Sequence, residues 1–250
     1  MKELPQAGRT ALVTGSSRNL GATICRELAR LGARLVVTYH QSRSDAEALA
    51  AALPGAGHLT VGGDASTGSG ARSVAKAALE AAGRIDILVN NLGPFSMVPF
   101  AELPEPEWDR VLDANLKAAY LSTQVVVPGM RSAGWGRVIN VSAGSAYIRN
   151  HSIYTLAKDA LITLTEQLAL ELGPEITVNG VSPGQIAESA EDVAAIDPTF
   201  VTRAIAHTPR QRLTTRAEVA AIVGLLCDAA FDMVTGVTIP VDGGWRLARF

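Results

Sequence analysis

The chain alternates between two kinds of segment along almost its whole length, and this alternation limits the possible folds most. Short runs rich in β-branched residues are typical of buried strands, and longer stretches rich in Ala and Leu with helical spacing separate them. The expected strands are 11–14, 34–39, 58–62, 85–89, 137–141, 176–181 and 237–241, and expected helices include 21–31, 71–82 and 155–172. Apolar strands in strand–helix–strand order predict a parallel sheet covered on both faces, in one doubly wound α/β domain spanning residues 1–250.

Composition excludes several classes of protein. A hydrophobic fraction of 48% with 18% charged residues excludes intrinsic disorder, and a formal net charge of −2 gives no global basic field for nucleic acid or an anionic membrane. Cys25 and Cys227 form neither a disulfide framework nor a zinc site, so we expect buried apolar roles in a reducing compartment. We find no apolar core of a signal peptide in the first ten residues and no apolar run long enough for a membrane span, and therefore expect a soluble, cytoplasmic protein.

Ligands of open parallel sheets bind beyond the carboxyl ends of the strands, so the residues after each strand deserve inspection. The first strand is followed by Thr14-Gly15-Ser16-Ser17-Arg18-Asn19-Leu20-Gly21 and then by an expected helix. Glycines there let the backbone approach a phosphate, and the helix N-terminus supplies N–H donors. The segment predicts a dinucleotide site, with an ordinary tight turn as the alternative.

The residues after the second strand bear on the choice between NAD and NADP. An acidic residue at this place accepts from the ribose 2′-hydroxyl of NAD, but no carboxylate occurs here before Asp45. Arg18 from the glycine turn is available as a donor to a 2′-phosphate. The strand end itself offers Tyr39, His40, Gln41, Ser42 and Arg43. We therefore favour NADP(H) as the cofactor over NAD, the other interpretation of these residues being a solvated turn.

Two weaker motifs follow the third and fourth strands. Asp64 offers a carboxylate to an adenine amine, although its spacing suits a helix cap near Thr67 equally well. The paired amides of Asn90 and Asn91 can satisfy open backbone groups and brace a loop.

The strongest local signal is the pair Tyr154 and Lys158. At positions i and i+4 they share one helix face. A nearby ammonium favours phenolate, so we expect Lys158 to lower the pKa of Tyr154 from its usual value of about 10. Such a phenol can exchange a proton with a carbonyl oxygen as hydride is transferred. A surface contact between two side chains is the alternative.

Together these motifs resemble the short-chain dehydrogenase/reductase family, over Arg9 to Gly244. The resemblance implies a seven-stranded Rossmann-like parallel sheet flanked by helices, an NAD(P) cofactor, and hydride transfer at a carbonyl or alcohol carbon of a small molecule. It also implies a homotetramer formed through the last helix and strand. The motifs that carry it are residues 14–21, Asp64, Asn90-Asn91-Leu92-Gly93, Asn115-Leu116-Lys117, Tyr154 with Lys158, Pro183-Gly184 and Val241-Asp242-Gly243-Gly244.

The resemblance also implies roles for single residues. Tyr154 would be the general acid/base, Lys158 would hold the nicotinamide ribose and depress the tyrosine pKa, and Asn115 would anchor a water that relays protons. The implied cofactor-binding set is Gly15, Ser17, Arg18, Asn19, Leu20, Gly21, Tyr39, His40, Gln41, Ser42, Asp64, Ala65, Asn91, Leu92, Gly93, Tyr154, Lys158, Pro183, Gly184 and Ile186.

Two departures from the family pattern affect cofactor binding. Asn19 replaces the middle glycine of the glycine turn, and since asparagine tolerates left-handed backbone, we expect binding to survive. Glu188 stands where the family commonly has threonine, with Ser189 as a substitute.

The third departure concerns the catalytic serine. The family often has it 13 residues before the tyrosine, which is Val141 here, whereas counting from the strand end gives Ala143. The remaining candidates are Ser142 and Ser145. We predict Ser142 as the hydroxyl that stabilises the developing oxyanion.

Three functions compete. The leading one is an NADPH-dependent carbonyl reductase, of the type that includes 3-oxoacyl-thioester reductases. The second is reduction of a pterin C=N bond, because residues 39–42, 153–158 and Phe95 are similar to pteridine reductases, although no carboxylate occurs at 142–143. The third is an NADP-binding protein without chemistry. Residues 187–212, which mix apolar side chains with arginines, are expected to form a lid over an apolar substrate, or else a packed surface helix pair.

Overall fold

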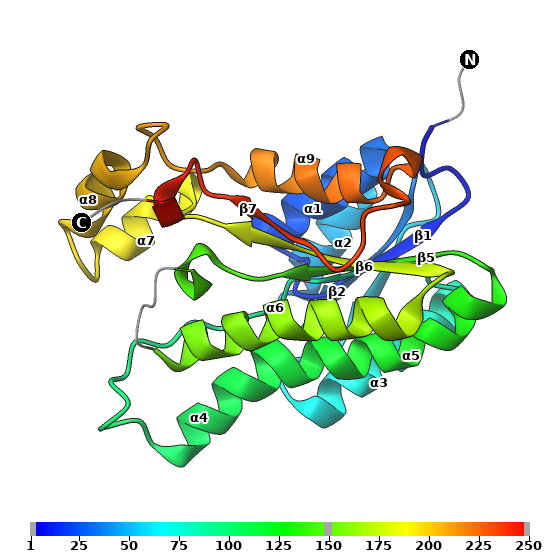
Figure 1. The fold of residues 1–250 in the computed structure, drawn as a ribbon. Coiled ribbons are helices and arrows are strands. Elements are labelled where there is room, and N and C mark those ends of the chain that lie inside the picture. Colours follow the sequence, from blue (N-terminus) through cyan, green and yellow to red (C-terminus); the bar gives the residue numbers. More distant parts are fainter. Residues whose placement is uncertain (1–3, 148–151, 248–250) are drawn as a thin grey trace.

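A computed structural model describes residues 4–147 and 152–247. Its strands lie parallel in one sheet in the order β3-β2-β1-β4-β5-β6-β7 (Figure 1). The strands are β1 (Thr10–Val13), β2 (Arg34–Tyr39), β3 (Leu59–Gly62), β4 (Ile87–Asn90), β5 (Gly136–Val141), β6 (Ile176–Pro183) and β7 (Thr238–Val241). Each begins and ends within two residues of the range predicted from sequence, so the seven-stranded, doubly wound parallel sheet is confirmed.

Helices cover both faces of the sheet (Figure 1). One face carries α1 (Asn19–Arg30), α2 (Arg43–Ala52) and α9 (Arg216–Leu226), and the other carries α3 (Gly68–Ala82), α5 (Ala118–Ser132) and α6 (Ile153–Leu172). Successive strand side chains point to opposite faces, so Ala11 and Val13 of β1 belong to the first core while Leu12 belongs to the second. Both cores consist mainly of aliphatic side chains, which explains the apolar runs in the sequence.

The strand order reverses direction between β1 and β4. The chain runs outward from β1 to β2 and β3, then returns to β4 and continues outward to β7. The two loops that leave β1 and β4 therefore separate, and ligands bind at such a switch point. The remaining helices are found around this end of the sheet: α4 (Glu105–Leu112), α7 (Ala190–Ala194) and α8 (Phe200–His207).

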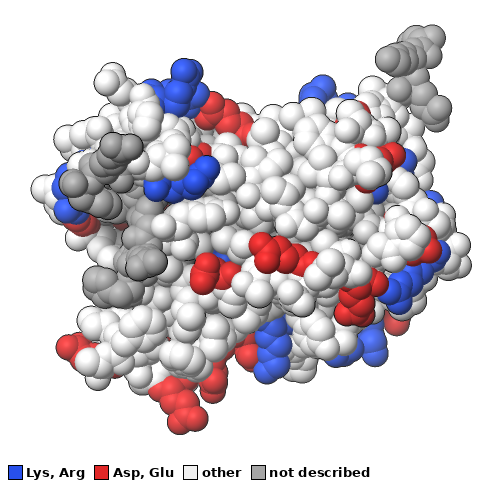
Figure 2. All heavy atoms as spheres, viewed as in Figure 1, with Lys and Arg blue, Asp and Glu red and all other residues white. Residues whose placement is uncertain are grey.

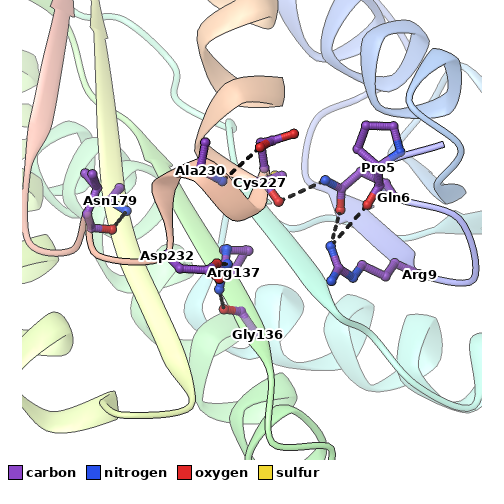
Figure 3. Close-up of polar contacts among 11 residues, drawn as sticks. Pro5, Gln6, Arg9, Gly136, Arg137, Asn179, Cys227, Ala230 and Asp232 are labelled. Carbon is purple, nitrogen blue, oxygen red and sulfur yellow. Dashed lines mark hydrogen bonds and ion pairs between the residues drawn. The ribbon is translucent and has the colours of Figure 1, made fainter. Parts of the chain in front are cut away.

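A buried polar cluster closes the opposite, amino-terminal end of the sheet (Figure 3). Gln6 is fully buried and donates to the Cys227 carbonyl at 2.8 Å. Arg137 of β5 is 3% exposed; it pairs with Asp232 and lies over Trp135, 4.3 Å from its ring centroid. The guanidinium of Arg9 lies 3.5 Å from the centroid of the same ring. These contacts join the N-terminal segment to β5 and to the turn after α9.

Several smaller predictions concern the cysteines, membrane spans, surface charge and assembly. Cys25 and Cys227 are both buried and free, as expected. None of the described helices is long and apolar enough to cross a membrane. Charged side chains of both signs are scattered over the face shown in Figure 2 rather than gathered in a single-sign patch. The homotetramer stays a prediction.

Candidate active site

The turn after β1 has the geometry of a phosphate cradle. Gly15 has φ +62° and Asn19 has φ +52°, so asparagine does adopt the left-handed conformation expected of it. A Cβ at Gly21 would lie 2.4 Å from the Gly15 carbonyl oxygen, so only glycine fits there. Helix α1 starts after Arg18 without a side-chain cap. Its open first-turn N–H groups and the exposed Arg18 fit a pyrophosphate, with half-buried Ser17 and buried Leu20 in the same turn.

Asn91 braces this turn from β4. Its side-chain amide donates to the carbonyls of Thr14 at 3.0 Å and Gly15 at 3.2 Å. The Thr14 hydroxyl accepts from the backbone N–H groups of Asn91 and Leu92. The predicted bracing role thus holds for Asn91, whereas the Asn90 amide donates to Asn140 inside the protein. The role of Thr14 was missed, although a hydroxyl directly after a strand and before a glycine turn was a usable signal.

The polar residues beyond β2 and β3 lie where the adenosine half of a dinucleotide would be held. His40 and Gln41 are exposed, and Tyr39 and Ser42 are half-buried. Asp64 accepts from the backbone N–H of Ser66 at 2.9 Å and from its hydroxyl at 2.5 Å, and these bonds hold the pKa of Asp64 below its usual value. Thr67, not Asp64, caps α3. Ala65 is buried beside Asp64.

Tyr154 and Lys158 lie on one face of the first turns of α6, which Ser152 caps through the Thr155 N–H. Lys158 is 2% exposed, and its ammonium donates to the Val141 carbonyl at 2.8 Å and lies 5.7 Å from the Tyr154 ring centroid. Burial lowers the pKa of Lys158 to about 7 and raises the pKa of Tyr154 to about 12. The expected lowering of the tyrosine pKa is therefore wrong for the protein alone, because burial of the phenol disfavours its charged form.

Asn115 lies in a π-helical turn (Asp113–Lys117) that joins α4 to α5. Such turns widen a helix and are frequent at functional sites. The Asn115 amide donates to the carbonyls of Pro94 and Val111, while its Oδ1 is buried without a partner among the described residues. A Cβ at Gly93 would lie 2.4 Å from that oxygen and 2.8 Å from the Lys158 ammonium. Glycine at position 93 thus lets Asn115 and Lys158 approach the same stretch of backbone.

The structure distinguishes the two candidate serines by their hydrogen bonds, and the role predicted for Ser142 stays a prediction. The Ser142 hydroxyl is buried and donates to the Lys158 carbonyl at 2.8 Å, so its proton is already used inside the protein. Ala143 occupies the next position. Ser145, in the 3₁₀ turn Gly144–Ala146, has a buried hydroxyl oxygen with no partner in the described part of the chain. The hydrogen bonds of the two hydroxyls distinguish Ser142 from Ser145, whereas their sequence distance from Tyr154 did not.

The segment after β6 closes the site. The Gly184 N–H donates to the Val241 carbonyl at 3.0 Å, directly after the last paired residues of β6 and β7, and a Cβ on Gly184 would lie 2.9 Å from the Asp242 Cα. Ile186, after Pro183-Gly184, pairs with Thr214. Glu188 accepts from the Arg216 backbone N–H, so it fixes the loop. Residues 187–212 form a short 3₁₀ turn (Ala187–Ser189) followed by α7 and α8.

The packing of Trp245 against the turn that carries Ser145 was not predicted from the sequence. This residue begins a 3₁₀ turn (Trp245–Leu247) that packs against the turn carrying Ser145. A Cβ at Gly144 would lie 3.5 Å from the Trp245 ring, and that ring meets Phe200 of α8 edge-on at 6.2 Å. The Asp242 carboxylate holds the segment by accepting from the N–H groups of Gly244 and Arg246.

A glycine turn, a tyrosine–lysine pair and a π-turn asparagine at the switch point of a parallel sheet define a nucleotide-dependent oxidoreductase. A family model described as enoyl-(acyl carrier protein) reductase matches residues 15–246. The chain belongs to the short-chain dehydrogenase/reductase family of oxidoreductases, whose members bind nicotinamide cofactors.

Several relatives match over nearly the whole chain. L-xylulose reductase from Bos taurus is 34% identical, over 97% of this chain and 98% of that protein. A tropinone reductase homologue from Arabidopsis thaliana is 33% identical, over 98% and 94%. The structure of a gluconate 5-dehydrogenase from Burkholderia cenocepacia in complex with NADP and tartrate is 27% identical, over 99% and 98%, with a TM-score of 0.89.

Proposed function

We propose that the protein is an NADPH-dependent carbonyl reductase acting on a small ketone, with Tyr154 as the proton donor. The observation that carries this proposal is the half-buried Tyr154 next to the buried Lys158 at the switch-point end of the sheet. A reduced nicotinamide, when bound, supplies the hydride. A tyrosine with a pKa of about 12 stays protonated at neutral pH, so it suits donation to a carbonyl oxygen that gains electrons.

The other polar groups have supporting roles in this proposal. Lys158 would contact the ribose beside the nicotinamide, and Asn115 Oδ1, which lacks a partner in the described residues, offers an acceptor to a relaying water. We assign the oxyanion-stabilising hydroxyl to Ser145, because the Ser142 proton is engaged by Lys158.

The preference for NADPH over NADH rests on the donors beyond β2. His40 and Gln41 are exposed, and the Arg18 guanidinium has no ion-pair partner among the described residues. The first carboxylates in this region, Asp45 and Glu47, lie in α2, and Glu47 pairs with Arg43 at 2.7 Å. A 2′-phosphate would find donors here rather than a repelling carboxylate. The neighbour with bound NADP is in keeping with this choice.

The test is oxidation of NADPH in the presence of a panel of ketones and dihydrobiopterin, with NADH measured in parallel. We expect turnover of at least one ketone, a preference for NADPH, and a fall in kcat of about 10²–10⁴-fold in Tyr154→Phe. Fluorescence titration should show that the variant still binds NADPH. Equal turnover by wild type and variant would overturn the mechanism. Tight NADPH binding with no turnover of any substrate would instead favour a non-catalytic NADP-binding protein.

A further inference from the structure

Two groups of aromatic rings form surfaces near the proposed catalytic residues, one against Tyr154 and the other against the turn that carries Ser145. The first is Phe95, in the loop after β4. Its ring is 49% exposed and meets the Tyr154 ring edge-on, at 5.0 Å between centroids and an interplanar angle of 73°. Its carbonyl accepts from Arg110, which holds the loop in place. A large apolar ring beside the proton donor leaves an open face for another ring to stack on.

The second surface is formed by Tyr147, Phe200 and Trp245, which lie further along the chain. Trp245 lies against Gly144 and therefore against the turn that carries Ser145. Phe200 of α8 meets the Trp245 ring at 89°. Tyr147 ends the same turn, and the Arg246 guanidinium covers its ring at 5.6 Å. Figure 1 shows the C-terminal turn beside α7 and near the turn after β5.

These rings are concentrated in a chain that has few. Only 5% of the residues are aromatic, yet Phe95, Tyr147, Tyr154, Phe200 and Trp245 all belong to these two surfaces. Several cations nearby are engaged within the chain: Arg110 by Glu107, Arg203 by Asp197, Arg216 by Glu188 and Ser189, and Arg246 by the Tyr147 ring. The aromatic rings therefore favour a substrate with a flat apolar face over a polyhydroxylated or anionic substrate.

We infer that the substrate is a ketone whose carbonyl is attached to, or fused with, an apolar aromatic ring, and that Phe95 and Trp245 determine this specificity. The inference rests on the proposed function. It separates this protein from relatives whose names specify L-xylulose or gluconate, both rich in hydroxyl groups.

The experiment compares 2-tetralone with cyclohexanone, which has a similar carbonyl and no aromatic ring, and with L-xylulose. We expect kcat/KM for 2-tetralone to exceed that for cyclohexanone by at least about ten-fold, because a pocket that buries the extra ring gains affinity for the transition state. Phe95→Ala and Trp245→Ala should each reduce this ratio several-fold. Trp108→Ala is the matched control, because Trp108 is a half-exposed aromatic residue whose ring neighbour is Phe100 rather than Tyr154.

Calorimetric measurement of 2-tetralone binding to the NADP complex distinguishes the reductase proposal from the proposal of an aromatic substrate site. Saturable binding that is weakened in Phe95→Ala, even without turnover, would support the aromatic site while removing the reductase. Turnover of cyclohexanone or L-xylulose as fast as 2-tetralone would support the reductase and overturn the aromatic preference. A tetralone preference that both variants retain would overturn the assignment of Phe95 and Trp245.

Discussion

The two ends of the sheet treat buried polar groups differently. At the amino end, Asp86 accepts from the Thr10 N–H and pairs with Arg84, Gln6 donates to Cys227, and Arg137 pairs with Asp232. At the carboxyl end, buried oxygens lack partners in the described residues. They belong to Asn90, Asn115, Ser145 and Ser182, whereas two buried atoms without a partner among those residues, Arg137 Nε and Thr177 Oγ1, lie near the amino end.

The contrast places most of the unpaired buried polar atoms of the described chain at the carboxyl end of the sheet. An unpaired buried polar atom costs on the order of 1–3 kcal/mol, so a chain that tolerates several at one edge must satisfy them with something else. A bound nucleotide, a substrate carbonyl or a relaying water would do so. The amino end needs none of these, since pairing within the chain satisfies most of its groups.

The largest effect expected from this contrast concerns Lys158. In the unfolded chain a lysine keeps its proton to about pH 10.5, whereas in the fold the pKa of Lys158 is lowered to about 7. Between these values the unfolded state binds more protons, so without nucleotide the free energy of unfolding should rise with pH above 7. Lys158→Met should remove this slope and gain up to about 4 kcal/mol near pH 7.

Urea unfolding at pH 7, 8 and 9, at one fixed protein concentration, measures the effect as the difference between wild type and Lys158→Met. Taking the difference cancels other groups that titrate in this range, such as the two buried cysteines, whose pKa burial raises to about 12. Parallel pH curves for the two proteins would show that Lys158 keeps its charge in the fold.

At the carboxyl end of the sheet, Ser142 and Ser145 allow a paired hydroxyl to be compared with an unpaired one. Ser145→Ala should lower kcat about 10²-fold without loss of stability, because its hydroxyl has no partner in the described structure and is the proposed donor to the oxyanion. Ser142→Ala should lose about 1 kcal/mol of stability, since it deletes a bond to the Lys158 carbonyl. Steady-state kinetics and urea unfolding on both variants give the result. The reverse pattern would restore Ser142 as the catalytic residue.

The fold was predictable because its signal is repeated. Apolar runs recur along the chain, and an α-helix comes after each strand from β1 to β6, so local errors of one or two residues did not alter the architecture. The left-handed Asn19 was likewise predictable, because only a few residue types adopt that backbone conformation and the turn required one.

The details of the site were harder to predict because they depend on contacts between distant segments. Whether Ser142 or Ser145 is free depends on a carbonyl 16 residues further along the chain. The pKa of Tyr154 depends on how much water the folded site excludes, which the i,i+4 spacing to Lys158 does not reveal. The hydrogen bonds of the Asp242 carboxylate hold the turn that places Trp245 against Gly144, and the sequence alone does not reveal this contact.

The smallest effect is expected at the amino end. Asp232→Asn keeps an acceptor for Arg137 but removes the negative charge, and because the Asp232 side chain is 59% exposed, water screens part of the loss. We expect a loss of about 1 kcal/mol in the free energy of unfolding, with kcat/KM and the KM for NADPH unchanged. Asp228→Asn is the matched control, because Asp228 caps the neighbouring turn through the Ala230 N–H and makes no ion pair with Arg137. A change in the KM for NADPH in Asp232→Asn alone would mean that the two ends of the sheet are energetically coupled, and that the paired edge contributes to function as well as to stability.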